Sequence, residues 1–136
     1  MYGETEMINE KPNGLHLMFP FPDAILNPNK IAHWTKKASA KKTSKTAGYY
    51  LAKEKAVILD SEKRYIVKLV FCPPDNRKRD LDNLLASMKS ALDGMCSGLG
   101  IDDSMIKPDP DWGPVTEGGK VEITIMEKIE PESRTG

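Results

Sequence analysis

The chain has 136 residues with 20 basic and 20 acidic side chains, which predicts a single domain of zero net charge. Apolar residues make up 39% and charged residues 29%, as in ordinary globular proteins, and no apolar run is long enough to cross a membrane. The N-terminus lacks the basic start and apolar centre of a signal peptide. Two cysteines, Cys72 and Cys96, are too few for a disulfide framework, so we expect reduced thiols in a cytoplasmic protein.

The predicted elements begin with a flexible arm over residues 1–13 and a strand over residues 14–20, in which apolar residues alternate. A long loop with several prolines and asparagines follows. A helical pattern then runs from Ser39 or Ser44 to Leu59, and Gly48 is a point where this helix could break.

Residues 63–73 form the clearest strand, because both of its faces are apolar except at Lys68, and this indicates a central place in a sheet. A second helix is expected from about Asp80, with apolar residues at three- and four-residue intervals, and with Gly98 and Gly100 ending it. After a proline-rich segment, two strands are expected around the turn at Gly118–Gly119.

These elements predict an α/β fold in the broad sense (α+β), with a small mixed four-stranded sheet and two main helices. The expected domain covers residues 14–128, and residues 129–136 form a C-terminal tail. No glycine-rich phosphate loop is present, so we expect no nucleotide cofactor. Because no long apolar run is present either, we expect no membrane partner.

The charges are distributed unevenly along this chain. Residues 30–55 contain eight lysines and one acid, whereas residues 101–136 contain nine acids and four bases. A cationic surface that holds phosphate groups is therefore compatible with a net charge of zero. The alternative is that these lysines only form the solvated face of an amphipathic helix.

Two aspartates, Asp80 and Asp82, stand where the second helix is expected to begin. Capping alone would explain them, because the free N–H groups and the dipole at a helix N-terminus stabilise negative charge. A metal site is the other interpretation, since Mg²⁺ binds one or two carboxylates together with phosphate oxygens and water.

Two observations favour the metal site. Asp82 shares a helix face with Ala86, Lys89 and Asp93, away from the apolar stripe, and three cations precede it in the sequence: Arg77, Lys78 and Arg79. A second acidic pair, Asp102 and Asp103, follows the helix. If the chain turns back along the helix, this pair supplies a third carboxylate, and bound divalent ions could then activate water and stabilise charge on a phosphate.

The sequence RKRDLDNLLASMKSALDGM (77–95), followed by GLGIDDSMI (98–106), resembles the signature of the RusA family of Holliday junction resolvases, the crossover junction endodeoxyribonucleases of bacteria and their phages. PVTEGGKVEITI (114–125) is similar to the closing hairpin of that family, and FPFPDAILNPN (19–29) is similar to its early proline-rich loop. The resemblance is clear over residues 73–127 and looser over residues 15–72.

The resemblance implies a homodimeric, magnesium-dependent nuclease that cuts four-way DNA junctions in symmetrically related strands, with manganese able to replace magnesium. We expect hydrolysis by activated water, leaving 5′-phosphate and 3′-hydroxyl ends. The metal-binding aspartates of the family correspond to Asp80, Asp82 and Asp103, and Asp102 is the alternative for the third. We expect the protein to act in DNA recombination and repair on the bacterial nucleoid, whether the gene is a host's or a phage's.

Ala86 departs from the family pattern, which has a functionally important lysine at this place. Lys89 follows on the same helix face, and we expect it to take over this role by reaching back toward Asp82. Lys78 or Arg79 could serve instead. The departure at Ala86 therefore concerns charge stabilisation in the transition state rather than metal binding.

We expect DNA to contact two groups of cations. They are the three that precede the second helix, Arg77, Lys78 and Arg79, and four lysines of the first helix, Lys36, Lys37, Lys41 and Lys42. Trp34 is a candidate for stacking on an unpaired base, although a packing role is equally consistent with the sequence. Two alternative functions remain open. One is a nuclease that cuts other branched DNA such as flaps and forks, and the other is a junction-binding protein that has lost catalysis.

Overall fold

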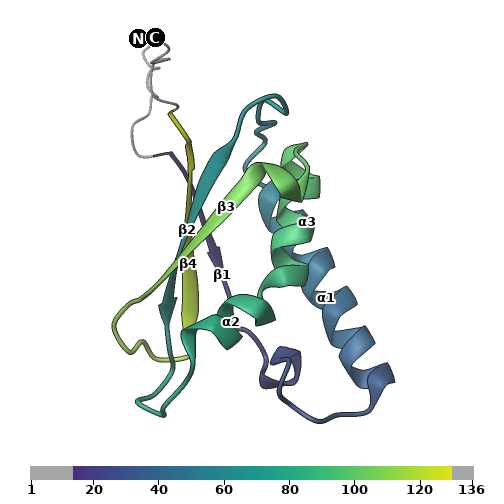
Figure 1. Cartoon of the computed structure of the whole chain (residues 1–136), viewed down its shortest axis with the longest axis vertical. Coiled ribbons are helices and arrows are strands. Elements are labelled where there is room, and N and C mark those ends of the chain that lie inside the picture. The colour runs from purple at the N-terminus through teal and green to yellow at the C-terminus, as the bar shows by residue number, and fades with distance from the viewer. Residues whose placement is uncertain (1–13, 130–136) are drawn as a thin grey trace, which may run out of the picture.

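The computed structural model describes residues 14–129, so the predicted N-terminal arm and almost all of the C-terminal tail lie outside the described range. Four strands form a single sheet in the order β1-β4-β2-β3, and the helices lie on one side of it (Figure 1). The strands are β1 (Leu15–Phe19), β2 (Tyr65–Cys72), β3 (Ile106–Trp112) and β4 (Lys120–Glu127). The helices are α1 (Trp34–Lys53), α2 (Leu81–Ser87) and α3 (Lys89–Leu99), with short 3-10 helices η2 (Ala24–Leu26) and η3 (Asp103–Met105).

The sheet is mixed, as the sequence predicts. β4 pairs antiparallel with both β1 and β2, whereas β2 and β3 run parallel. Parallel neighbours need a crossover connection, and α2 and α3 supply it between β2 and β3. The expected strands at 14–20 and 63–73 are confirmed as β1 and β2, and β2 has an internal place in the sheet.

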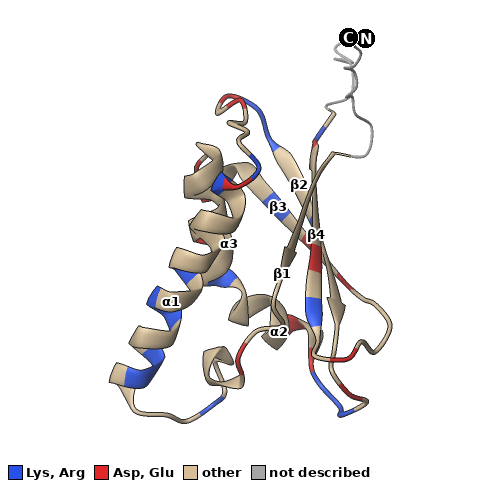
Figure 2. Ribbon diagram, turned by 180° about the vertical axis from the view of Figure 1, so that it is seen from behind, with Lys and Arg blue, Asp and Glu red and all other residues tan. Residues whose placement is uncertain are grey.

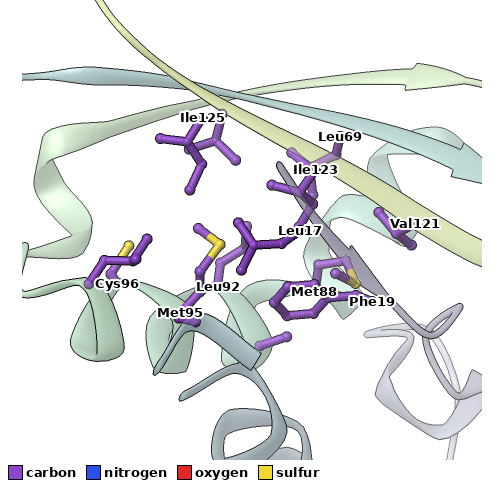
Figure 3. Packing of buried hydrophobic residues seen from close by; sticks show 14 of the residues in the cluster. Leu17, Phe19, Leu69, Met88, Leu92, Met95, Cys96, Val121, Ile123 and Ile125 are labelled. Carbon is purple, nitrogen blue, oxygen red and sulfur yellow. The ribbon is translucent and has the colours of Figure 1, made fainter. Parts of the chain in front are cut away.

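The core lies between one face of the sheet and α3. Alternate residues of β1, β2 and β4 point toward α3 because successive side chains of a strand project to opposite faces. Their burial removes apolar surface from water, which stabilises the fold by about 1.5–3 kcal/mol for each large side chain. Figure 3 shows these residues meeting across the interface: Leu17, Phe19, Leu69, Val121, Ile123 and Ile125 on the sheet, and Met88, Leu92, Met95 and Cys96 on the helical side.

The other face of the sheet carries no helix of the described chain (Figure 2). Ile66 and Val70 of β2 are half-buried on it, and Met18 of β1 is exposed. The apolar character of both faces of β2 therefore correctly indicates an internal strand. It does not reflect a second layer of helices.

Helix α1 begins at Trp34, which is earlier than the expected Ser39 or Ser44, and ends at Lys53 instead of Leu59. His33 caps its N-terminus, because its Nδ1 accepts a hydrogen bond from the Thr35 N–H at 3.2 Å. At the other end Ala56 has a φ of 54°, which a continuing helix excludes. Within residues 14–129, no helix is both long and apolar enough to cross a membrane.

α1 continues unbroken through Gly48, where the sequence indicated a weak point. An added Cβ at Gly48 would lie 2.1 Å from the Ala91 carbonyl oxygen, and one at Gly94 would lie 1.9 Å from the Lys45 carbonyl oxygen. These glycines therefore allow the backbones of α1 and α3 to approach closely.

The second predicted helix is two helices, so the described chain has three α-helices and the expectation of two main ones is corrected. The break falls at Met88, whose φ of −89° and ψ of −2° leave the regular helix. Ser87 contributes, because its hydroxyl donates to the Asn83 carbonyl oxygen at 2.8 Å, a bond that often bends helices. Gly100 ends α3 with a φ of 79°, whereas Gly98 lies inside α3 and does not stop it.

The proline-rich segment after η3 is strand β3, and the predicted closing hairpin is absent. β3 and β4 are not neighbours, because β2 lies between them. Pro108 and Pro110 fit an edge strand, since a proline has no N–H to donate to a central ladder.

Candidate active site

A cavity of about 380 Å³ opens between the α2–α3 pair and the start of β3. Its apolar walls come from Leu85, Leu92, Ile106 and Pro108, and its polar groups come from Asp82, Lys89, Asp93 and Asp103, with Ala86 between them. The expected return of the chain along the helices is therefore confirmed, because it brings Asp103 of the second acidic pair to the same cavity as Asp82.

The two residues of the first acidic pair lie in different environments. Oδ1 of Asp80 accepts hydrogen bonds from the N–H groups of Asp82 at 2.8 Å and Asn83 at 3.3 Å, so Asp80 is the N-cap of α2 as expected. Asp82 lies in the first turn and lines the cavity. Asp80 does not line it, and both of its cap bonds use the same oxygen.

In the second acidic pair too, one residue caps a helix and the other lines the cavity. Asp102 caps η3, because its Oδ2 accepts from the Ser104 N–H at 3.0 Å and from the Ser104 hydroxyl. These hydrogen bonds hold the pKa of Asp102 below its usual value. Asp103 lines the cavity, so the geometry favours Asp103 over Asp102 as the third carboxylate of the site.

Lys89 joins two elements of the site. Its Nζ lies 3.7 Å from Oδ1 of Asp93, one turn along α3, and 3.8 Å from Oδ2 of Asp103. Because α3 starts at Lys89, the side chain does not have to reach back along a continuous helix, as the sequence suggested. Among the described residues it pairs with Asp93 and Asp103 rather than with Asp82.

Asp93 was not among the expected site residues. Burial raises the pKa of Asp93, and a hydrogen bond with the Asp103 carboxyl and the charge of that group raise it further, while Lys89 and Lys45 oppose the shift. Asp93 and Asp103 therefore form a close pair of carboxyls with one ammonium beside them. The four-residue spacing from Lys89 to Asp93 was the sequence signal for its place on this face.

Cys96 is a buried core residue of α3. Burial and the negative charges of Asp103, Asp93 and Asp102 raise the pKa of its thiol to about 12. The thiol is therefore protonated at neutral pH and is a poor nucleophile. Both Cys72 and Cys96 are buried free thiols, which agrees with the expectation of no disulfide.

The three loop cations before α2 have different partners. Arg79 is 15% exposed and forms an ion pair with Asp75 at 3.0 Å, and its guanidinium lies over the Phe21 ring. Arg77 is exposed and lies 3.7 Å from Asp75, and Lys78 is exposed. Arg79 therefore holds the loop together, and it is less suited than Arg77 or Lys78 to contact a ligand in solvent.

The lysines of α1 also differ in whether they line a cavity. Lys37 and Lys41 line a smaller cavity next to the first one, whereas Lys36 and Lys42 do not line it. Trp34, at the start of α1, is 74% exposed and stacks on His33, so it is not a core residue of the described chain.

The carboxylates of the site suit a hard divalent ion by their chemistry, because Mg²⁺ prefers oxygen ligands. They are not assembled around a single point. Among residues 14–129, no group of three or more His, Cys, Asp or Glu side chains is arranged to hold a metal ion. Ion binding would therefore require the side chains of the cavity to rotate.

The chain belongs to the same family as an uncharacterized protein of Xylella fastidiosa (strain Temecula1 / ATCC 700964), to which it is 32% identical over 124 residues. That match covers 88% of this chain and 81% of the Xylella protein. No protein-family model matches the sequence.

Part of the chain is also similar to crossover junction endodeoxyribonuclease RusA. The proteins of Escherichia coli (strain K12) and Shigella sonnei (strain Ss046) are each 42% identical over 59 residues, which are 40% of this chain and 44% of the relative. This chain thus matches less than half of the length of these proteins. This partial similarity to RusA supports a nuclease role.

The structure of the thiamine-monophosphate kinase of Stenotrophomonas maltophilia K279a can be aligned with this protein. The alignment covers 90% of this chain and 33% of the kinase chain. The TM-score is 0.32 at 10% identity, which is too low to support an argument about fold or function.

Proposed function

We propose that this protein is a magnesium-dependent endodeoxyribonuclease that resolves four-way DNA junctions by paired, symmetric cuts. The observation that carries the proposal is the cavity that combines Asp82, Asp93 and Asp103 with Lys89. The partial similarity to RusA supports the same activity.

The charges of the cavity explain why a cation is needed. A DNA phosphodiester is anionic, and three nearby carboxylates would repel it. Lys89 supplies one positive charge, which does not balance three carboxylates and a phosphate. A divalent ion between the carboxylates and the phosphate would remove this repulsion, so the composition of the cavity favours metal-dependent phosphate chemistry over a purely protein-based mechanism.

We propose Asp82 and Asp103 as the central metal ligands, with Asp93 as an addition to the set expected from the sequence. Asp80 is retained as a ligand through Oδ2, because its cap bonds use Oδ1. Bound magnesium, or manganese in its place, would supply polarised water and charge stabilisation at the phosphate. The products would carry 5′-phosphate and 3′-hydroxyl ends.

The side chains of the protein have separate tasks in this proposal. Asp80 fixes the first turn of α2, which orients Asp82 toward the cavity. With an ion held by the carboxylates, the ammonium of Lys89 would be released from Asp103 and would offset the negative charge on the phosphate. Lys89 would thereby take the role that the RusA-like pattern gives to the position of Ala86. Lys78 is the alternative, and Arg79 is less suited to the role because it is bonded to the loop.

A homodimer would fit the substrate, because two coordinated cuts in a two-fold junction need two sites related by the same symmetry. The dimer is part of the proposal, as are the roles in recombination and repair. A flap or fork nuclease and an inactive junction-binding protein are the alternative functions.

Purified protein mixed with synthetic four-way junctions, flaps and forks in magnesium tests the proposal. Paired symmetric nicks in the junction support a resolvase, and faster cutting of flaps or forks supports the broader nuclease. Tight binding without products in magnesium or manganese would contradict both enzymatic functions. A Lys89→Met variant, compared with Lys89→Arg, then measures the need for the cation: we expect kcat to fall strongly in the first and partly recover in the second.

A further inference from the structure

A second groove runs on from the carboxylate cavity. It encloses about 240 Å³ and is bounded by Leu26 and Pro28 of the early loop, by α1, and by the α2–α3 junction. Ala86, Lys89 and Asp93 line both spaces, so the two spaces adjoin at these residues. A chain-like ligand in the carboxylate cavity would therefore have the groove next to it.

α1 supplies the positive charge of this groove. It contains lysines and no acid, and Figure 2 shows basic positions recurring along it. Lys37 and Lys41 are four residues apart, so they share one helix face, and both line the groove. Lys36 and Lys42 are each one residue away, which turns them by about 100° to other faces.

Lys37 also helps to build the groove wall. Its Nζ donates a hydrogen bond to the Asn27 carbonyl oxygen at 3.2 Å, which ties the early loop to α1. Asp23 caps η2 in the same loop. Lys41 is exposed beside this wall. Next to Lys89, the groove thus has two further cations: Lys37, which is hydrogen-bonded to the early loop, and Lys41, which is exposed.

We propose that Lys37 and Lys41 bind the sugar-phosphate backbone of the strand being cut, so that this strand passes from the carboxylate cavity through the groove, and that Lys36 and Lys42 do not contact it. The proposal rests on the proposed nuclease function and identifies which lysines of α1 serve it. Phosphate contacts of this kind add affinity that is independent of sequence and falls with salt. The strand acquires a fixed direction over the site, which selects the phosphate that is cut.

Two double variants with the same net charge test this assignment. The first combines Lys37→Gln with Lys41→Gln, and the second combines Lys36→Gln with Lys42→Gln. Both remove two cations from α1 and keep residues with good helix propensity. Junction cleavage is measured at several salt concentrations. We expect the 37/41 variant to raise KM about tenfold or more and to reduce the slope of log KM against log salt by about 1.8, because each lost phosphate contact contributes about 0.9. We expect the 36/42 variant to change KM less than twofold.

Equal losses in the two double variants, from a wild type that cuts junctions, would overturn this assignment and leave the nuclease function standing. If the wild type binds junctions without cutting them, the same comparison of Kd and salt slope decides the assignment while the nuclease function fails. If it neither binds nor cuts branched DNA, both proposals fail.

The role of Lys37 in the loop requires a separate control. Lys37→Arg keeps the charge, and a single Lys41→Gln leaves the contact with Asn27 intact. We expect the first to retain near wild-type KM and the second to raise KM about threefold or more, with unchanged Tm. A loss confined to variants with a lowered Tm would show that the lysines only maintain the loop, and it would overturn the proposal.

Discussion

Nζ of Lys89 lies 3.8 Å from Oδ2 of Asp103, and this contact joins the first turn of α3 to the turn that precedes β3. The two residues are brought together by the return of the chain after Gly100, whose left-handed conformation ends α3. The same return places Asp103 beside Asp93. The site therefore depends on a turn as well as on the helix that carries its first aspartate.

The second acidic pair should respond unequally to substitution. Asp103→Asn removes a carboxylate from the cavity, and we expect junction cleavage in magnesium to fall at least 100-fold. Asp102→Asn removes the same charge outside the cavity and keeps a side-chain oxygen that can cap η3, so we expect cleavage to fall less than tenfold and the free energy of unfolding to change by less than about 0.5 kcal/mol. Initial cleavage rates and urea unfolding of both variants provide the measurement. A greater loss of cleavage in the Asp102 variant would reverse the assignment.

Asp93 should make stability depend on pH. Its pKa is raised by burial and by Asp103, so the folded state binds the proton more tightly than the unfolded state, whose value is about 3.9. Stability contributed by this group is present at low pH and is lost as pH rises through its folded pKa. In urea unfolding with EDTA, we therefore expect Asp93→Asn to be more stable than wild type at pH 7, with an advantage that shrinks toward pH 4. An advantage that grows on acidification would contradict the shift.

The close approach of α1 and α3 should make Gly94 intolerant of a side chain. Gly94→Ala would place a Cβ 1.9 Å from the Lys45 carbonyl oxygen, so the helices must separate. We expect a loss of about 1–3 kcal/mol in the free energy of unfolding, as for other overpacked interiors. Ser39→Ala on the exposed side of α1 is the control and should change stability by less than about 0.5 kcal/mol. Equal stabilities of the two variants would contradict the tight helix contact.

Trp34 should contribute to binding and little to stability, because it is 74% exposed. If it stacks on an unpaired base, Trp34→Ala should weaken junction binding about fivefold or more, since such stacking is worth roughly 1–3 kcal/mol. Fluorescence anisotropy with a labelled junction measures this effect. Trp112→Ala on β3 is the matched control, because that residue is also exposed, at 43%. Equal affinities for the two variants would leave Trp34 without a role in binding.

Local sequence signals predicted the elements that local rules control. The alternation in residues 15–19 and 65–72 was sufficient for β1 and β2, and the Asp80 cap was correct because it depends on neighbouring N–H groups. Spacing also placed Asp82 on an open face, whereas Asp103 was expected from the resemblance to the RusA family, with Asp102 as the alternative.

The remaining features depend on contacts that spacing does not contain. The apolar stripe continues through Met88, so its period gives no sign of the break there; the Ser87 bond to Asn83 and the packing of α3 on α1 decide it. β3 was not predicted because prolines disfavour strands, and only its place at the sheet edge makes them acceptable. Gly48 indicated a weak point in the helix, whereas in the structure it allows the backbone of α3 to approach α1 closely.

An Asp82→Asn variant tests whether Asp82 belongs to a metal-dependent nuclease site. Cleavage and binding of a synthetic four-way junction are measured together in magnesium, with Asp109→Asn as a control of equal charge change. Asp109 follows Pro108 on β3 and so projects to the opposite face of the sheet from the cavity. We predict that Asp82→Asn abolishes cleavage while junction affinity is unchanged or tighter, and that Asp109→Asn cuts as wild type does. Undiminished cleavage by the Asp82 variant would contradict the proposed site.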